Sequence, residues 1–283
     1  MSSPRFLITG ATGFLGRRVV ARASGVGVVV AGSRTPSAKE GTVFLDVSDA
    51  EATIDTIVRV APKAIIHLAA INPGQGDDDE MWRVNAEGSA AVALGAVRSG
   101  ARLVSVSTDV VHDGTAAPYA DDVAPSPLNA YGSSKAAGEV SVLEVDPSAV
   151  VVRTSLMYGL DTIDRGTAGF ADRIHRNEPV QLFTDVIRNP IWVETLAEAL
   201  VRLVDSDFSG LVNIAGTESL SRYDYGVAML DHWGIAHEGR LEAVLAADVS
   251  DTIPRDLRLD SSRARTLLDM DLPGVHDVLT ARA

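Results

Sequence analysis

The sequence contains no cysteine, which excludes disulfide bonds, thiolate catalysis and metal sites built on thiolates. No stretch approaches the roughly 20 uninterrupted apolar residues of a membrane span. The N-terminal residues lead directly into an apolar run and lack the pattern of a signal peptide. We therefore expect a cytoplasmic protein that does not associate with membranes.

The sequence has fewer basic than acidic residues. It contains 25 Lys and Arg and 38 Asp and Glu, which give a formal net charge of −13. This balance argues against nonspecific nucleic-acid binding, which needs a cationic surface. An anionic ligand has to be met by local cations and helix N-termini. The histidines are scattered singly and no His, Asp and Glu cluster has metal spacing, so we expect no catalytic metal. His67 lies inside an apolar run, which favours a packed core residue over a ligand.

Apolar runs rich in β-branched residues alternate with helical stretches in the first part of the chain. The runs cover 5–9, 26–31, 43–45, 64–69, 102–107 and 150–153, and the helical stretches cover 14–23, 50–60, 81–99 and 131–144. Nearly continuous apolar runs are typical of strands buried on both faces of a parallel sheet. The alternation predicts an α/β protein with a doubly wound parallel sheet, a Rossmann fold.

Beyond residue 159 the pattern is less regular. It predicts helices at 168–176, 194–205 and 223–233, a strand at 211–214, a turn at 188–190 and a short final helix at 261–268. The acidic run at 74–80 is interpreted as a solvated loop. We expect a dinucleotide-binding domain over 1–158, to which elements at about 186–206 return, and mainly a smaller substrate-binding lobe over 159–283.

A glycine-rich turn follows the first apolar run and precedes the first helix. Its residues are Gly10, Ala11, Thr12, Gly13, Phe14, Leu15 and Gly16. Strand, glycine turn and helix form the context of a dinucleotide-binding fingerprint. Gly10 permits the sharp turn, Gly13 lets backbone N–H groups approach a pyrophosphate, and Gly16 lets the helix pack on the sheet. An ordinary strand-to-helix turn can have the same glycine pattern, so the other motifs of the chain have to distinguish the two interpretations.

Tyr131 and Lys135 are four residues apart in a predicted helix and share one helical face. A neighbouring ammonium stabilises a phenolate, which would let the tyrosine exchange a proton with a substrate oxygen near neutral pH. Thr108 ends an apolar run, and the carboxyl end of such a strand faces the ligand crevice of a doubly wound sheet. A hydroxyl at that position can hydrogen-bond the same substrate oxygen, although Ser-Thr-Asp also starts ordinary turns.

These motifs together resemble an extended short-chain dehydrogenase/reductase, and within that superfamily the dTDP-4-dehydrorhamnose reductase family. The resemblance rests on the three glycines, Tyr131-x-x-x-Lys135, Asn85, and the segments 107–114, 127–139 and 152–159. It implies hydride transfer from a nicotinamide cofactor to a keto group of a nucleotide-activated sugar. The implied roles are Tyr131 as general acid, Lys135 on the nicotinamide ribose and Thr108 on the keto oxygen.

The resemblance also implies positions for the two ligands. Contacts to the cofactor are expected from Asp46, Val47, Leu68, Ala69, Ala70 and Asn85, besides the glycine turn, Tyr131 and Lys135. Contacts to the substrate are expected from Asp109, Val110, Thr154, Leu156 and Arg188. For Arg188, which could bind a diphosphate, a structural salt bridge is an equal alternative. A homodimer is common in this superfamily.

The choice between NADP(H) and NAD(H) is predicted from the end of the second apolar run. A Rossmann protein that prefers NAD usually has an acidic residue there. This chain has Ser33 and Arg34 instead, and an arginine can pair with a 2′-phosphate through charge-assisted hydrogen bonds. NADP(H) is therefore favoured, and NAD(H) stays possible if Arg34 is a solvated cation.

The chain departs from the family at positions that concern the substrate. Val110 and His112 replace a tyrosine and a phenylalanine of the usual motif, and Leu156 stands where the family tends to have tryptophan. The exact sugar is therefore open. A nucleotide-sugar epimerase is an alternative, as is a noncatalytic regulatory subunit like the β subunit of methionine adenosyltransferase. A dehydratase is disfavoured, because Val110 replaces the glutamate of its usual Asp-Glu pair.

Overall fold

The structure is a computed structural model that describes residues 3–35 and 38–282. The chain forms two compact units. The first unit comprises Met1–Val111, Asn129–Arg153 and Ala197–Val212, and the second comprises His112–Leu128, Thr154–Leu196 and Asn213–Ala283.

The first unit is built on a seven-stranded sheet with the order β11-β6-β5-β4-β1-β2-β3. The strands are β1 (Arg5–Thr9), β2 (Val28–Ser33), β3 (Thr42–Phe44), β4 (Ala64–His67), β5 (Arg102–Thr108), β6 (Val150–Thr154) and β11 (Gly210–Ile214). The pairs from β5 across to β3 run parallel. The strand order reverses beside β1, which is where doubly wound sheets bind their ligands.

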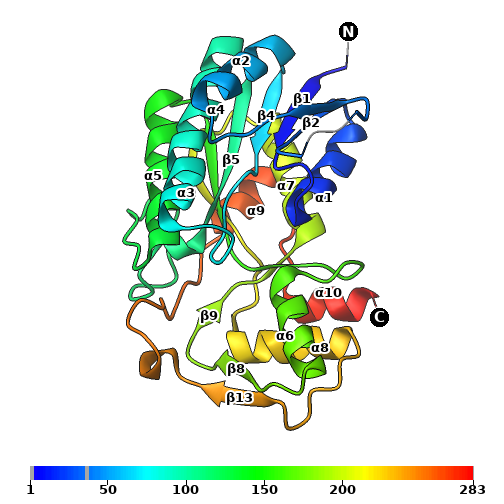
Figure 1. Ribbon diagram of the computed structural model, residues 1–283, viewed down its shortest axis with the longest axis vertical. Coiled ribbons are helices and arrows are strands. Elements are labelled where there is room, and N and C mark those ends of the chain that lie inside the picture. Colours follow the sequence, from blue (N-terminus) through cyan, green and yellow to red (C-terminus); the bar gives the residue numbers. More distant parts are fainter. Residues whose placement is uncertain (1–2, 36–37, 283) are drawn as a thin grey trace. The chain divides into compact units, whose positions relative to one another are not determined.

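Helices cover both faces of this sheet (Figure 1). On one face α2 (Ala50–Val60), α4 (Gly88–Ser99) and α5 (Ala130–Val145) pack in a row. On the other face α1 (Phe14–Ser24) meets α7 (Val193–Val204), and Arg22 of α1 forms an ion pair with Glu198 of α7. The predicted doubly wound α/β fold is confirmed, because apolar strands fill the space between the two helical layers.

The core of the first unit consists of aliphatic side chains from the strands and the overlying helices. Leu7, Ile65 and Leu103 are fully buried at its centre, and Ile57 of α2 and Val92 of α4 pack against them. Burying a large aliphatic side chain contributes about 1.5–3 kcal/mol. The nearly continuous apolar strands seen in the sequence are explained by this two-sided burial.

The second unit combines helices with three two-stranded sheets. Its helices are α6 (Arg165–His175), α8 (Arg222–His232), α9 (Ser262–Leu268) and α10 (Val275–Arg282), with a 3₁₀ turn at η3 (Ala246–Asp248). The strand pairs are β7 (Met157–Tyr158) with β10 (Ile191–Trp192), β9 (Ile187–Arg188) with β12 (Leu220–Ser221), and β8 (Val180–Phe183) with β13 (Leu241–Val244).

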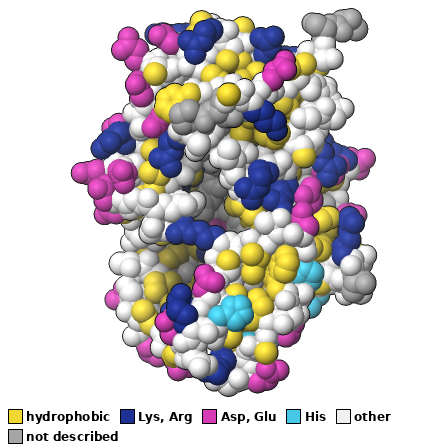
Figure 2. Space-filling view, turned by 45° about the vertical axis from the view of Figure 1, so that its right-hand side comes forward, with side chains coloured by type: hydrophobic (Ala, Val, Ile, Leu, Met, Phe, Trp, Pro, Cys, Tyr) yellow, Lys and Arg dark blue, Asp and Glu magenta, His cyan; other side chains and the backbone are white. Residues whose placement is uncertain are grey.

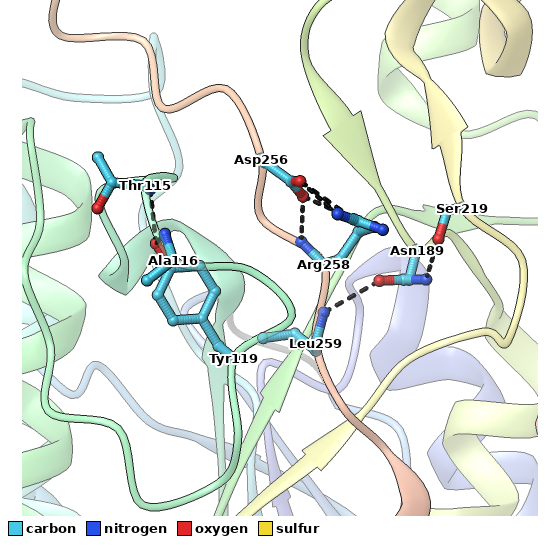
Figure 3. Close-up of polar contacts among 8 residues, drawn as sticks. All are labelled: Thr115, Ala116, Tyr119, Asn189, Ser219, Asp256, Arg258 and Leu259. Carbon is cyan, nitrogen blue, oxygen red and sulfur yellow. Dashed lines mark hydrogen bonds and ion pairs between the residues drawn. The ribbon is translucent and has the colours of Figure 1, made fainter.

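Side-chain hydrogen bonds hold the loops of the second unit together (Figure 3). The Tyr119 hydroxyl accepts the backbone N–H groups of Thr115 and Ala116. Asn189 accepts the N–H of Leu259 at 3.0 Å and donates to Ser219 Oγ at 3.2 Å. These bonds fix irregular backbone where no regular ladder is available.

Several elements differ from the sequence-based expectation. The acidic run at 74–80 is a loop only in its first part, because its last three residues open α3 (Asp78–Trp82), which Asp77 caps in a capping box with Glu80. Helix α10 follows the helix that was expected to be final. The strands β8 and β13 were not predicted, since each has four residues and only alternate side chains of β8 are buried. The Asp-x-x-Glu spacing of a capping box was available in the sequence.

Charged side chains of both signs are interspersed over the face shown in Figure 2, with hydrophobic side chains between them. Within the described residues, no helix is long and apolar enough to cross a membrane.

Candidate active site

The glycine turn leaves β1 and opens α1. Gly10 has φ +63°, a conformation that favours glycine, and a Cβ on it would lie 2.8 Å from Ala69 N. A Cβ on Gly16 would lie 2.2 Å from Gly10 O, so the helix can approach the turn only because that residue is glycine. Thr12 and Gly13 are exposed, and no side chain of the described residues caps α1. The turn therefore presents an open helix N-terminus, which suits a pyrophosphate.

The residues expected at the cofactor's adenosine end lie at the end of β2 and in the segments that follow β2 and β3. Ser33 ends β2 and its hydroxyl accepts the N–H of Thr35 at 3.1 Å, while Arg34 is exposed. Asp46 follows β3 and its carboxylate accepts the Ser48 hydroxyl at 2.8 Å. Because neither Ser33 nor Arg34 is acidic, no carboxylate at these two positions would repel a 2′-phosphate.

Thr108 is the last residue of β5, and Asp109 and Val110 belong to the 3₁₀ turn η2 (Asp109–Val111) that follows. The Thr108 hydroxyl lies 3.2 Å from the Asp109 carboxylate and accepts the Val110 N–H at 3.3 Å. Ser107 Oγ is buried and has no hydrogen-bond partner among the described residues. The Ser107 hydroxyl can serve a bound ligand, because an orphaned buried hydroxyl is otherwise costly.

Tyr131 and Lys135 share one face of α5, which contacts β5 and η2. Asn129 caps the helix by accepting the N–H of Gly132 at 2.9 Å. Lys135 is 6% exposed and its Nζ donates to Val106 O at 2.8 Å, which ties the helix to the strand that carries Thr108. Tyr131 is half-buried. The structure thus gathers the three predicted catalytic residues in the first unit.

Burial lowers the pKa of the Lys135 ammonium from its ordinary 10.5 to about 8, and the nearby Glu139 carboxylate acts in the opposite direction. The lysine is therefore mostly protonated at neutral pH. A buried ammonium one helical turn from a phenol favours the deprotonated phenolate electrostatically.

Asn85 lies in a π-helical turn, η1 (Arg83–Glu87), between α3 and α4. It is fully buried, and its amide accepts the N–H of Ile71 and donates to the Ile71 carbonyl, both at 2.9 Å. The same amide donates to Ser134 Oγ on α5 at 3.1 Å. π-Turns are frequent at functional sites. Asn85 therefore supports the loop that contains Leu68, Ala69 and Ala70.

One buried ion pair was missed by the sequence interpretation. Arg153 of β6 is 0% exposed, and its guanidinium pairs with the Glu139 carboxylate at 2.8 Å. Glu139 is one helical turn from Lys135 on α5. The signal was present, since an arginine inside a wholly buried strand has to find a partner.

The residues expected to bind substrate include three in the second unit. Thr154 is 4% exposed and donates its hydroxyl to Ile214 O at 2.7 Å. Leu156 is half-buried against the cluster around Tyr158. Arg188 is half-buried in β9. Their contacts within this unit are structural, and their role toward a substrate stays a prediction.

His67 was expected to be a packed core residue, and its burial confirms this. No group of three or more His, Cys, Asp or Glu side chains within residues 3–35 and 38–282 is arranged to hold a metal ion.

Comparisons with known proteins agree with the resemblance seen in the sequence. A family model described as "RmlD substrate binding domain" matches residues 4–280. The methionine adenosyltransferase 2 subunit beta of Rattus norvegicus is 30% identical over 278 residues, covering 94% of this chain and 83% of that protein. The dTDP-4-keto-6-deoxy-D-glucose reductase of Streptomyces niveus is 35% identical over 231 residues, covering 78% and 75%. The crystal structure of a dTDP-4-dehydrorhamnose reductase from Bacillus anthracis in complex with NADP has a TM-score of 0.85 and 23% identity, covering 99% and 98%.

Proposed function

Because the chain belongs to the RmlD substrate-binding domain family, we propose that it is an NADPH-dependent reductase of a nucleotide-activated keto sugar. The observation that carries this proposal is the gathering of Thr108, Tyr131 and Lys135 in one unit, with Lys135 bonded to the strand of Thr108. The related Streptomyces reductase supports a 4-keto sugar as the substrate class.

The residues of the first unit fit a dinucleotide. The exposed turn at Thr12 and Gly13 and the first N–H groups of α1 would hold the pyrophosphate. Arg34 would meet a 2′-phosphate with Ser33 beside it. When bound, the nicotinamide supplies the hydride for the keto carbon.

The chain's own residues supply the proton and the orientation. The Thr108 hydroxyl, which donates its proton to the Asp109 carboxylate at 3.2 Å, would turn that proton toward the keto oxygen of the substrate and so orient it. Tyr131 then gives its phenolic proton to that oxygen as negative charge develops on it. Lys135 would hold the nicotinamide ribose of a bound cofactor, and its ammonium would stabilise the phenolate left on Tyr131. The low exposure of Lys135 strengthens this electrostatic effect, because little water screens it.

Substitution of Tyr131 tests the proposal. Tyr131→Phe removes the proton donor, and we expect the rate of NADPH oxidation with dTDP-4-keto-6-deoxyglucose to fall about 100-fold or more. Tyr223→Phe is the matched control, since Tyr223 on α8 is also half-buried and is not one of the proposed catalytic or binding residues. Full activity of Tyr131→Phe contradicts the proposed role. A wild-type protein that reduces no 4-keto nucleotide sugar contradicts the substrate class.

A noncatalytic regulatory subunit is the second candidate, favoured by the 30% identity to methionine adenosyltransferase 2 subunit beta. The two candidates differ in what Tyr131 does. A regulatory subunit retains all its measurable properties in Tyr131→Phe, whereas a reductase loses its turnover. A purified protein that carries stoichiometric NAD favours an epimerase instead, because an epimerase keeps its nicotinamide through the cycle.

A further inference from the structure

A chain of buried hydrogen bonds connects β1, β4 and α4. The parallel pairing of β1 with β4 sets Thr9 opposite His67. Thr9 Oγ1 lies 2.7 Å from His67 Nδ1, and His67 Nε2 lies 3.1 Å from Ser89 Oγ. Thr9 Oγ1 also accepts the backbone N–H groups of Leu68 and Ala69, each at 3.1 Å. All three side chains are almost fully buried, with Thr9 and His67 1% and Ser89 2% exposed.

The hydrogen bonds fix where each proton lies. A hydroxyl oxygen accepts two hydrogen bonds and donates one. Because Thr9 Oγ1 already accepts two N–H groups, its own proton is donated to His67 Nδ1. The imidazole therefore carries its proton on Nε2 and donates it to Ser89 Oγ. Burial, with a smaller effect from the Lys135 ammonium, lowers the pKa of His67 to about 3, so the ring stays neutral.

The chain continues from Ser89 to the helix of Tyr131. Ser89 Oγ donates to the Asn85 carbonyl at 2.7 Å. The Asn85 amide holds both backbone polar groups of Ile71 and donates to Ser134 Oγ. Ser134 Oγ donates to the Tyr131 carbonyl at 2.9 Å. One polar path thus links the loop at 68–71 with the first turn of α5.

Close packing holds the two ends of this path in place. A Cβ on Gly138 of α5 would lie 2.3 Å from Asn85 O and 3.4 Å from Ser89 Oγ. A Cβ on Gly10 would lie 2.9 Å from Leu68 C. Helix α5 is in close contact with the π-turn, and the glycine turn is in close contact with the loop at 68–71. A displacement of either segment therefore cannot be taken up by empty space around it.

We propose that His67, with Thr9 and Ser89, is a positioning residue that sets the cofactor-side loop at 68–71 relative to the helix of Tyr131. The imidazole accepts on one side and donates on the other, which an aliphatic core residue cannot do. In an ordinary buried histidine, the hydrogen bonds serve only to satisfy the two ring nitrogens. The hydrogen bonds of His67 also connect the loop at 68–71 with the path to the helix of Tyr131, and both segments carry proposed site residues. The inference rests on the proposed function for its link to cofactor and catalysis.

Ser89→Ala and Ser99→Ala form a matched pair for the test. Both serines lie on α4 and donate to the carbonyl four residues earlier, Ser89 to Asn85 and Ser99 to Gly95 at 2.8 Å. Only Ser89 is also bonded to His67. We expect Ser89→Ala to weaken NADPH binding by about tenfold and to lower kcat at saturating substrate, since small misplacements cost large factors in rate. Ser99→Ala is expected to change neither value.

Thr9→Val and Thr9→Ser separate the hydroxyl from the shape of the side chain. Valine removes the donor to His67 and the acceptor of two backbone N–H groups, whereas serine keeps both. We expect Thr9→Val to weaken NADPH binding and Thr9→Ser to keep the wild-type NADPH affinity. Both titrations follow NADPH fluorescence, well below the unfolding temperature of each variant, so a loss of stability alone alters neither value.

The two possible failures are distinguishable. Equal NADPH affinity and equal kcat in Ser89→Ala and Ser99→Ala overturn the positioning role, whatever the substrate. A wild-type protein that binds NADPH but reduces no keto sugar overturns the proposed function. In that case the NADPH affinities of the two pairs still decide whether His67 positions the loop.

Discussion

The buried imidazole of His67 makes the stability of the protein sensitive to acid in a calculable way. Burial is the main cause that lowers its pKa from the ordinary 6.5 to about 3, and the charge on Lys135 adds to it. In the unfolded chain the same ring takes up a proton at its ordinary pKa. The perturbation is a change of buffer from about pH 7.5 to about pH 4.5.

The sign follows from which state binds the proton. Between 6.5 and about 3 the unfolded state holds a proton on His67 that the folded state lacks. The free energy of unfolding therefore falls as the pH falls through this window, and His67 has no effect above it. At about pH 4.5 the ring accounts for a loss of about 3 kcal/mol, since each unit of pKa difference is worth about 1.4 kcal/mol.

Urea unfolding at the two pH values measures this loss. We expect His67→Gln to lose about 3 kcal/mol less than the wild type on acidification, because glutamine does not titrate. His175→Gln is the control, since His175 is exposed on α6 and its replacement leaves His67 intact. Equal losses in the wild type and His67→Gln refute the reasoning.

Nuclear magnetic resonance of the wild-type protein gives an independent reading. The His67 ring resonances are expected to stay in the neutral form with the proton on Nε2 throughout the range in which the folded protein persists. A ring that titrates near its ordinary pKa of 6.5 in the folded protein contradicts both the burial argument and the direction of the hydrogen bonds.

Three further predictions concern the proposed site and its support. The turnover rate should fall as the pH rises through about 8, because Lys135 loses its proton there, and a pH profile flat to about pH 10 contradicts this. Arg34→Ala should erase a preference for NADPH over NADH of at least about tenfold, or 1.4 kcal/mol, in a fluorescence titration, and an unchanged ratio contradicts the 2′-phosphate contact. Glu139→Ala should lower the free energy of unfolding by about 3–5 kcal/mol, since it removes the carboxylate that pairs with the buried Arg153 guanidinium; urea unfolding with a loss below about 1 kcal/mol contradicts this.

Local features of the molecule could be predicted from the sequence. The glycine turn depends on residues within one strand-turn-helix unit, since Gly10 has a positive φ and Gly16 lies directly against Gly10 O. Tyr131 and Lys135 share a face because of helical periodicity alone. The alternation of apolar runs with helical stretches was sufficient to predict the doubly wound sheet. A strand that is buried on both faces is apolar along its whole length, and this can be read from each strand separately.

The tertiary structure decided which side chains hold the proposed site residues in place. Thr9 and His67 are 58 positions apart, and they meet because of the register between β1 and β4. Glu139 and Arg153 find each other across α5 and β6. Hydrogen-bond partners of this kind depend on which strands and helices become neighbours and in what register, and a pattern along the chain carries no information on that choice. The sequence by itself determined the residues that do the proposed chemistry, and only the packing of the sheet against its helices decided what holds them in position.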